Sequence, residues 1–246
     1  MENNELQFNN FKIHTQYSIC EGAIKIDDLA NYCKSNKIKV IGICDSFNLC
    51  GALEFSEKLS KVGTQPIIGT QINFKLGDYV SKIPLFASSE DGFKNLSKLS
   101  SKSYIEINPT EDPHCEIKDL LDFDKGIIIT SGGVRDFFGG LFKLNRINDL
   151  ENIVVSIKKK YLDRFYLEIQ RHNDINEKDY ENFLLNISLK HKIPIIASQE
   201  VYYLKDDMVE AHDALTCIGN KNLVIDNNRE KLSPEHYIKS IDELKE

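Results

Sequence analysis

The residues of this chain that could take part in chemistry follow short apolar runs, one or two at a time. They are His14, Asp45, Ser46, Gln71, the Ser-Gly-Gly run 131–133, Glu200 and Tyr202. In parallel α/β architectures, ligands bind at the carboxyl ends of strands, so we expect these side chains to lie close together. Histidine and carboxylate side chains hold hydrolytic metal ions, but this set contains few of them. The pattern is typical of a metal site from which ligands have been removed.

The elements that position these residues are read from apolar periodicity. Besides the run that ends at His14, six short runs rich in β-branched residues predict strands at 39–44, 66–74, 83–88, 126–130, 164–169 and 194–198. Helical spacing of apolar residues predicts helices at 26–33, 49–59, 93–99, 153–161 and 180–191. Strands that alternate with helices predict one domain with a parallel sheet or barrel.

Charge and composition exclude some classes of function. The chain has 31 basic and 38 acidic residues, a formal net charge of −7, which disfavours autonomous DNA binding. Six cysteines without a CxxC pair favour a reducing compartment. The polar start of the chain and its short apolar runs predict neither a signal peptide nor a membrane span. We therefore expect a cytoplasmic protein.

Two helix-start signals stand near the end of the sequence. "SPEHY" at 233–237 places a serine cap before a proline, and "SIDE" at 240–243 is a capping box. The second helix would scarcely begin before residue 246. This arrangement favours a fragment of a longer protein.

Several of these runs, in order and over nearly the whole chain, carry a resemblance to a known family. They include "IHTQYSICEGA", "ICDSFNLCGALEFSEKLSKVGTQPIIGTQINF", "GIIITSGG", "IPIIASQEVYYLKDDMVEAHDAL" and "SPEHYIKSIDEL". The sequence resembles the N-terminal PHP (polymerase and histidinol phosphatase) domain of bacterial DNA polymerase III alpha subunits, most closely the proteobacterial branch. The resemblance implies a distorted (β/α)7 TIM-like barrel over residues 1–225. Residues 226–246 would then be an extension towards the body of a DNA-directed DNA polymerase, a nucleotidyltransferase of DNA replication.

The resemblance also assigns the positions of the family's metal ligands. His14 and Asp45 are retained, and Glu200 is a possible carboxylate replacement. The other ligand positions carry replacements, which are Lys12, Ser46, Gln71, Lys82, Gly133 and Tyr202. Zinc or manganese needs three or four well-placed ligands, and two lysines near the site would repel a cation. The resemblance therefore implies remnant positions, with no metal, no other cofactor and no catalytic residue in this domain.

Two main functions remain open, and metal content separates them. The first is a catalytically silent structural domain that docks the proofreading exonuclease subunit and buttresses the rest of the alpha subunit. The alternative is a metal-dependent phosphoesterase or 3′–5′ exonuclease. A free-standing histidinol phosphatase is disfavoured by the interrupted helix at the end of the sequence.

The replacement at position 12 leads to a specific expectation. Asp45 and Glu200 would face each other in the old site, and each would raise the pKa of the other. The ammonium group of Lys12 would then bridge to Asp45 or Glu200 as a fixed cation in place of the metal. The alternative is that Lys12 extends to solvent at the barrel mouth.

Three further features have simpler interpretations. His172 is expected to be a polar loop histidine, although it could face the pocket. His212 lies in a predicted helix and is expected to cap or pack. The Ser-Gly-Gly run could form an anion-binding nest, but two glycines in a turn more often serve backbone geometry.

Overall fold

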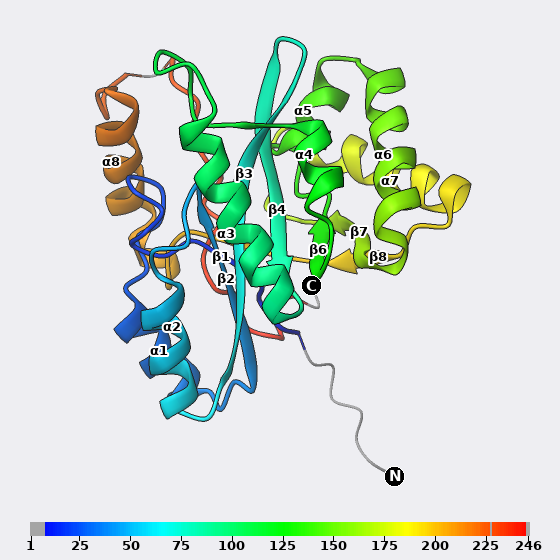
Figure 1. Ribbon diagram of the computed structural model, residues 1–246. Coiled ribbons are helices and arrows are strands. Elements are labelled where there is room, and N and C mark those ends of the chain that lie inside the picture. Colours follow the sequence, from blue (N-terminus) through cyan, green and yellow to red (C-terminus); the bar gives the residue numbers. More distant parts are fainter. Residues whose placement is uncertain (1–7, 227, 245–246) are drawn as a thin grey trace.

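A curled mixed sheet, seen as a half-barrel in Figure 1, organises the chain. The computed structural model describes residues 8–226 and 228–244. The main sheet has the order β2-β3-β4-β6-β7-β8, with β5 beside β3, and β1 pairs with β9. The strands are β1 (Lys12–Ile13), β2 (Val40–Ser46), β3 (Gln65–Leu76), β4 (Tyr79–Ala87), β5 (Cys115–Glu116), β6 (Ile127–Thr130), β7 (Phe165–Ile169), β8 (Ile195–Ala197) and β9 (Glu200–Val201).

Helices cover the outside of this sheet, with α1 and α2 at one end of the molecule and α6 and α7 at the other (Figure 1). They are α1 (Ile26–Ser35), α2 (Ala52–Lys61), α3 (Glu90–Ile105), α4 (Ile117–Asp122), α5 (Phe137–Lys143), α6 (Ile147–Tyr161), α7 (Glu177–His191) and α8 (Val209–Asn220). Two short 3-10 helices lie at Leu162–Arg164 and Asp206–Met208. The α/β fold expected from the sequence is confirmed.

The parallel strand order expected from alternating strands and helices is wrong at one strand. β4 runs antiparallel to both β3 and β6, whereas β2–β3, β6–β7 and β7–β8 are parallel. The cause is a two-residue hairpin in which Leu76 pairs with Tyr79. Gly77 has a φ of +65° in this turn, a conformation that glycine adopts without strain. The tight turn reverses the chain before a crossover helix can form.

The predicted helices form because their apolar stripes face the sheet. In α1 the buried residues are Ile26, Leu29, Ala30 and Cys33, the set predicted from helical spacing. Helix α5 escaped prediction because Phe137–Leu141 is buried throughout, so it has no polar face and no amphipathic period. This helix is nevertheless important, because it begins directly after Asp136, a residue of the site.

The predicted helix start at 233–237 is wrong. The chain there lies along the end of β9: the backbone N–H of Tyr202 donates to the carbonyl of His236 (2.9 Å), and Tyr203 pairs with Tyr237. These tertiary backbone contacts satisfy the groups that a helix would have used. The capping box at Ser240 and Glu243 does form, with the Ser240 N–H donating to the Glu243 carboxylate (2.7 Å). Among all described residues, no helix is long and apolar enough to cross a membrane.

Candidate functional site

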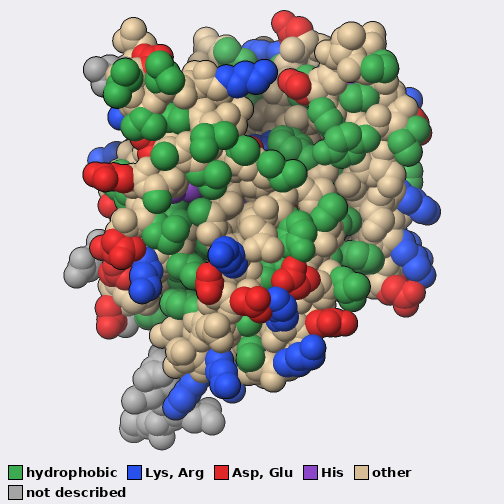
Figure 2. Space-filling model, turned by 90° about the vertical axis from the view of Figure 1, so that its left-hand side faces the viewer, with side chains coloured by type: hydrophobic (Ala, Val, Ile, Leu, Met, Phe, Trp, Pro, Cys, Tyr) green, Lys and Arg blue, Asp and Glu red, His purple; other side chains and the backbone are tan. Residues whose placement is uncertain are grey.

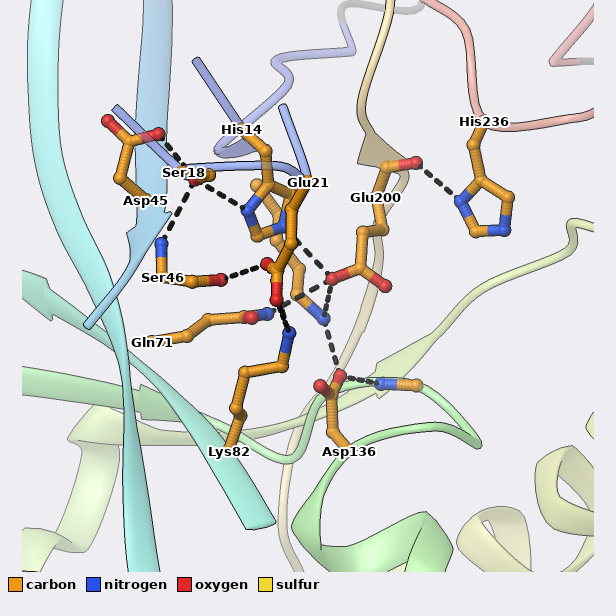
Figure 3. Close-up of polar contacts among 12 residues, drawn as sticks. His14, Ser18, Glu21, Asp45, Ser46, Gln71, Lys82, Asp136, Glu200 and His236 are labelled. Carbon is orange, nitrogen blue, oxygen red and sulfur yellow. Dashed lines mark hydrogen bonds and ion pairs between the residues drawn. The ribbon is translucent and has the colours of Figure 1, made fainter. Parts of the chain in front are cut away.

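The pairing of two short strands, β1 and β9, creates the site. β1 and β9 are parallel, and their register places Lys12 beside Glu200 and Ile13 beside Val201. The backbone N–H of His14 donates to the carbonyl of Val201 (2.8 Å), which extends this pairing by one step. The side chains of His14, Gln71 and Glu200 then point towards one another (Figure 3).

Lys12 lies at the centre of this cluster and is only 1% exposed. Its ammonium group contacts the carboxylate of Asp136 at 2.5 Å and that of Glu200 at 3.1 Å. Burial alone would lower the pKa of Lys12, but the charges of Asp136 and Glu200 outweigh burial and hold this pKa well above its usual value. The bridge from Lys12 to Glu200 is confirmed, and extension of Lys12 into solvent is wrong.

Glu200 gathers three donors around one carboxylate oxygen. Oε1 lies 3.1 Å from Lys12 Nζ, from Nε2 of His14 and from the side-chain nitrogen of Gln71. Burial alone would raise the pKa of Glu200, but the Lys12 charge and the His14 hydrogen bond hold it well below its usual value. The expected mutual rise in pKa with Asp45 is therefore wrong for Glu200, because its nearest charged neighbour is a cation.

Asp45, at the end of β2, does not meet Lys12. It accepts hydrogen bonds from the Thr15 N–H (2.6 Å), the Thr15 hydroxyl (2.8 Å) and the Ser18 hydroxyl (2.7 Å). The predicted bridge from Lys12 to Asp45 is wrong because local donors satisfy this carboxylate. Ser18 also lies 3.3 Å from Nδ1 of His14, so Asp45 fixes the loop that follows β1 and orients the histidine.

A second chain of contacts joins two of the replaced ligand positions. The Ser46 hydroxyl donates to the carboxylate of Glu21 (2.5 Å), and the ammonium group of Lys82 contacts the same carboxylate at 3.3 Å. Burial alone would raise the pKa of Glu21, but Lys82 and other donors lower it. The side chain of Lys82 is 22% exposed, so this pair lies nearer the mouth of the site than Lys12 does.

The Ser-Gly-Gly turn holds Asp136 rather than an external anion. The backbone N–H of Gly133 donates to Oδ2 of Asp136 (2.8 Å), and Gly132 has a φ of +69°. A Cβ atom at Gly133 would lie 2.2 Å from the side-chain oxygen of Gln170, so the space of a side chain here is already filled. Burial, together with the nearby charge of Glu200, holds the pKa of Asp136 above its usual value, although Lys12 lowers it.

Aromatic stacking fixes the histidines around Glu200. The rings of His14 and Tyr202 stack with centroids 4.4 Å apart, and those of His172 and His236 stack at 4.2 Å. His172 lies in the loop after β7, as expected, but it is only 1% exposed, and its Nε2 accepts from the Glu200 N–H (3.1 Å). His212 packs as expected, with Nε2 donating to the carbonyl of Glu21 (2.7 Å).

The donor set does not fit a metal ion. Within residues 8–226 and 228–244, no group of three or more His, Cys, Asp or Glu side chains is placed to hold one. The carboxylates of Asp45 and Glu200 accept hydrogen bonds from protein donors, and Nε2 of His14 is itself one of the donors to Glu200. The ammonium group of Lys12 lies between the carboxylates of Asp136 and Glu200. A cavity of about 290 Å³ adjoins Glu200, Asp136 and Lys82.

The sequence interpretation missed three acidic residues of this region. Asp136 and Glu21 come from loops, whereas Glu168 lies within β7, where it accepts from Gln170 (2.5 Å) and Ser198 (2.6 Å). Asp136 stands three residues after the Ser-Gly-Gly run, and Glu168 interrupts an apolar strand. A buried strand carries an acid only when a partner compensates it, so Glu168 offered a usable signal.

The amino-acid sequence is similar to known proteins over nearly its whole length. A family model described as the PHP domain matches residues 10–172. DNA polymerase III subunit alpha of Caulobacter vibrioides is 31% identical over 97% of this chain and 22% of its own length. The same subunit of Borreliella burgdorferi is 33% identical over 97% of this chain and 22% of its own. This chain therefore spans about a fifth of these relatives.

Solved structures share the fold at low sequence identity. An amidohydrolase from Chromobacterium violaceum, solved with bound sulfate and no metal, has a TM-score of 0.51 at 9% identity and covers 79% of this chain and 87% of its own. A structure from Bifidobacterium adolescentis has a TM-score of 0.50 at 12% identity, with coverages of 80% and 88%. At these identities the likeness concerns the fold alone.

Proposed function

Because this chain belongs to the PHP domain family and is related to the N-terminal region of DNA polymerase III alpha subunits, we propose that it is a catalytically silent structural domain that docks the proofreading exonuclease subunit. One observation carries the first half of this proposal. The ammonium group of Lys12 is buried between Asp136 and Glu200, in the place where a cation would be needed to neutralise these carboxylates.

A hydrolytic metal centre needs several free ligands and one open coordination position for water. Here the ligand atoms that remain are engaged by Lys12, Gln71, Ser18 and Thr15. The alternative, a metal-dependent phosphoesterase or 3′–5′ exonuclease, would require Lys12 to leave a site in which it is 1% exposed. Such a displacement would leave two buried carboxylates without their cation, which is costly.

The first test is metal content together with turnover. We expect the 246-residue chain, purified from medium supplemented with zinc and manganese, to contain no stoichiometric metal by inductively coupled plasma mass spectrometry. We also expect no hydrolysis of p-nitrophenyl phosphate or of a single-stranded oligonucleotide above a buffer control. One zinc or manganese ion per chain, in a preparation that also hydrolyses either substrate, would contradict the proposal that the domain is catalytically inactive.

The docking half of the proposal rests on the family relationship and on charge. A net charge of −7 gives no favourable field for a phosphate backbone. We expect fluorescence anisotropy at near-physiological salt to show binding of the labelled chain to the exonuclease subunit of its own polymerase and little binding to labelled DNA. Tight binding of DNA with no detectable binding of the exonuclease subunit would reject it.

A further inference from the structure

A cluster of exposed apolar side chains surrounds the C-terminal end of α8, and we call it the α8 surface. Its members are Ile19, Ile218, Leu223, Val224 and Ile225. The exposed fractions of Ile19, Ile218 and Ile225 are 81%, 72% and 83%. Figure 2 shows hydrophobic side chains gathered on the upper part of the face that carries α8, beside a hollow. Contiguous exposed apolar side chains mark interaction sites more often than isolated ones do.

The backbone that presents this surface is held in place. The guanidinium group of Arg229 forms a bidentate ion pair with Asp213 of α8, and the side chain of Arg229 is only 3% exposed. It also donates to the carbonyl of Val224 (3.3 Å), and the Asn222 N–H donates to the carbonyl of Cys217 (2.9 Å). The segment after α8 is thus fixed with its apolar side chains outward. A preorganised surface loses little conformational entropy when a partner binds.

Contact between α8 and the N-terminal loop joins the parts of the surface. A Cβ atom at Gly219 would lie 2.6 Å from Cβ of Cys20, so the last turn of α8 lies against the loop that carries Ile19. Cys20, Thr216 and Asn220 also line the cavity of about 290 Å³ that reaches Glu200. The apolar surface therefore continues into a hollow whose deeper wall is charged.

Charge around the surface indicates the kind of partner. Residues 205–235 contain seven acidic and four basic side chains, a net charge of −3. A second copy of this chain would bring a like-charged surface, which disfavours self-association. A partner segment with apolar anchors and basic residues would complement both the exposed apolar side chains and the negative charge of this surface.

We propose that the α8 surface is where this domain binds the proofreading exonuclease subunit, through an apolar segment of that subunit that carries basic residues. This inference rests on the proposed function, because it takes the partner from there and adds the surface. Apolar side chains at the centre supply affinity, and the surrounding acidic residues speed the encounter.

The test compares the 246-residue chain with the double variant Ile218→Ser, Ile225→Ser. Serine removes apolar area without changing charge. The matched control is Leu189→Ser on α7, which removes an equally exposed side chain (80%) elsewhere. We expect the double variant to bind the exonuclease subunit at least about tenfold more weakly by anisotropy, and the control to bind like the parent. Equal urea midpoints for the three proteins would show that folding is unchanged.

Each outcome decides one claim. If the parent binds the exonuclease subunit and the double variant binds equally well, the α8 surface is not the docking site, although docking itself stands. If the parent does not bind the subunit, the proposed docking function is wrong, and the α8 surface cannot be the docking site for that subunit. If sedimentation velocity shows a dimer of the parent that the double variant abolishes, the surface serves self-association and the inference is overturned.

Discussion

Replacing Lys12 with methionine is expected to lower the free energy of unfolding by about 3–5 kcal/mol. Methionine keeps most of the side-chain volume but removes the only cation that contacts both Asp136 and Glu200 among the described residues. Two buried carboxylates would then face each other, and one would have to take up a proton or remain uncompensated. Urea denaturation at neutral pH, followed by circular dichroism, measures this change.

Lys82→Met is the matched control for this experiment. Lys82 also occupies a replaced ligand position and also pairs with a carboxylate, that of Glu21. Its side chain is 22% exposed and that of Glu21 is 32% exposed, so solvent screens the pair. We expect a loss of about 1 kcal/mol or less. If Lys12→Met were as stable as the parent, Lys12 would have no structural role.

Replacing Asp45 with alanine is expected to cost about 3 kcal/mol or more, without any involvement of a metal. The variant would leave the N–H and hydroxyl of Thr15 and the hydroxyl of Ser18 without their acceptor in a buried loop. Each unsatisfied buried donor costs about 1–3 kcal/mol. Urea denaturation in the presence of a chelator measures the loss under conditions in which no metal can contribute.

Asp45→Asn separates hydrogen bonding from the loss of volume. The amide keeps one acceptor oxygen but replaces the other with a donor, so we expect a loss of about 1–2 kcal/mol, between the parent and Asp45→Ala. If Asp45→Ala matched the parent in chelator but lost stability relative to it in added manganese, Asp45 would be a metal ligand rather than a structural acceptor.

The fold could be predicted where local periodicity and burial agree. The helices α1 and α7 and the strands β2, β6 and β7 have sequence patterns that their observed burial reproduces. The antiparallel course of β4 depends on a hairpin turn, and its apolar run has the same composition in either direction. Residues 233–237 carry a helix-start signal but form no helix, because their backbone pairs with the chain after β9 instead.

The site could be predicted only in part, because its partners are distant in sequence. The resemblance placed Lys12 at a ligand position, and of the two bridges expected from it the one to Glu200 is present. Asp136 lies 124 residues from Lys12 and is placed by a glycine turn, so no spacing rule connects the two. The family resemblance predicts only the positions of metal ligands, so it says nothing about a residue such as Asp136 that is not at one of those positions. The acid that completes the buried ion-pair cluster was missed for this reason.

The central claim, that Lys12 supplies the cation of this site, is tested most directly by a double-mutant cycle between Lys12→Met and Glu200→Gln. The four proteins are compared by urea denaturation at pH 7 in chelator. If the ammonium group neutralises Glu200, the double variant will be more stable than the sum of the single losses predicts, by about 1–3 kcal/mol. Losses that add to within about 0.5 kcal/mol would contradict the claim, because independent sites behave in that way.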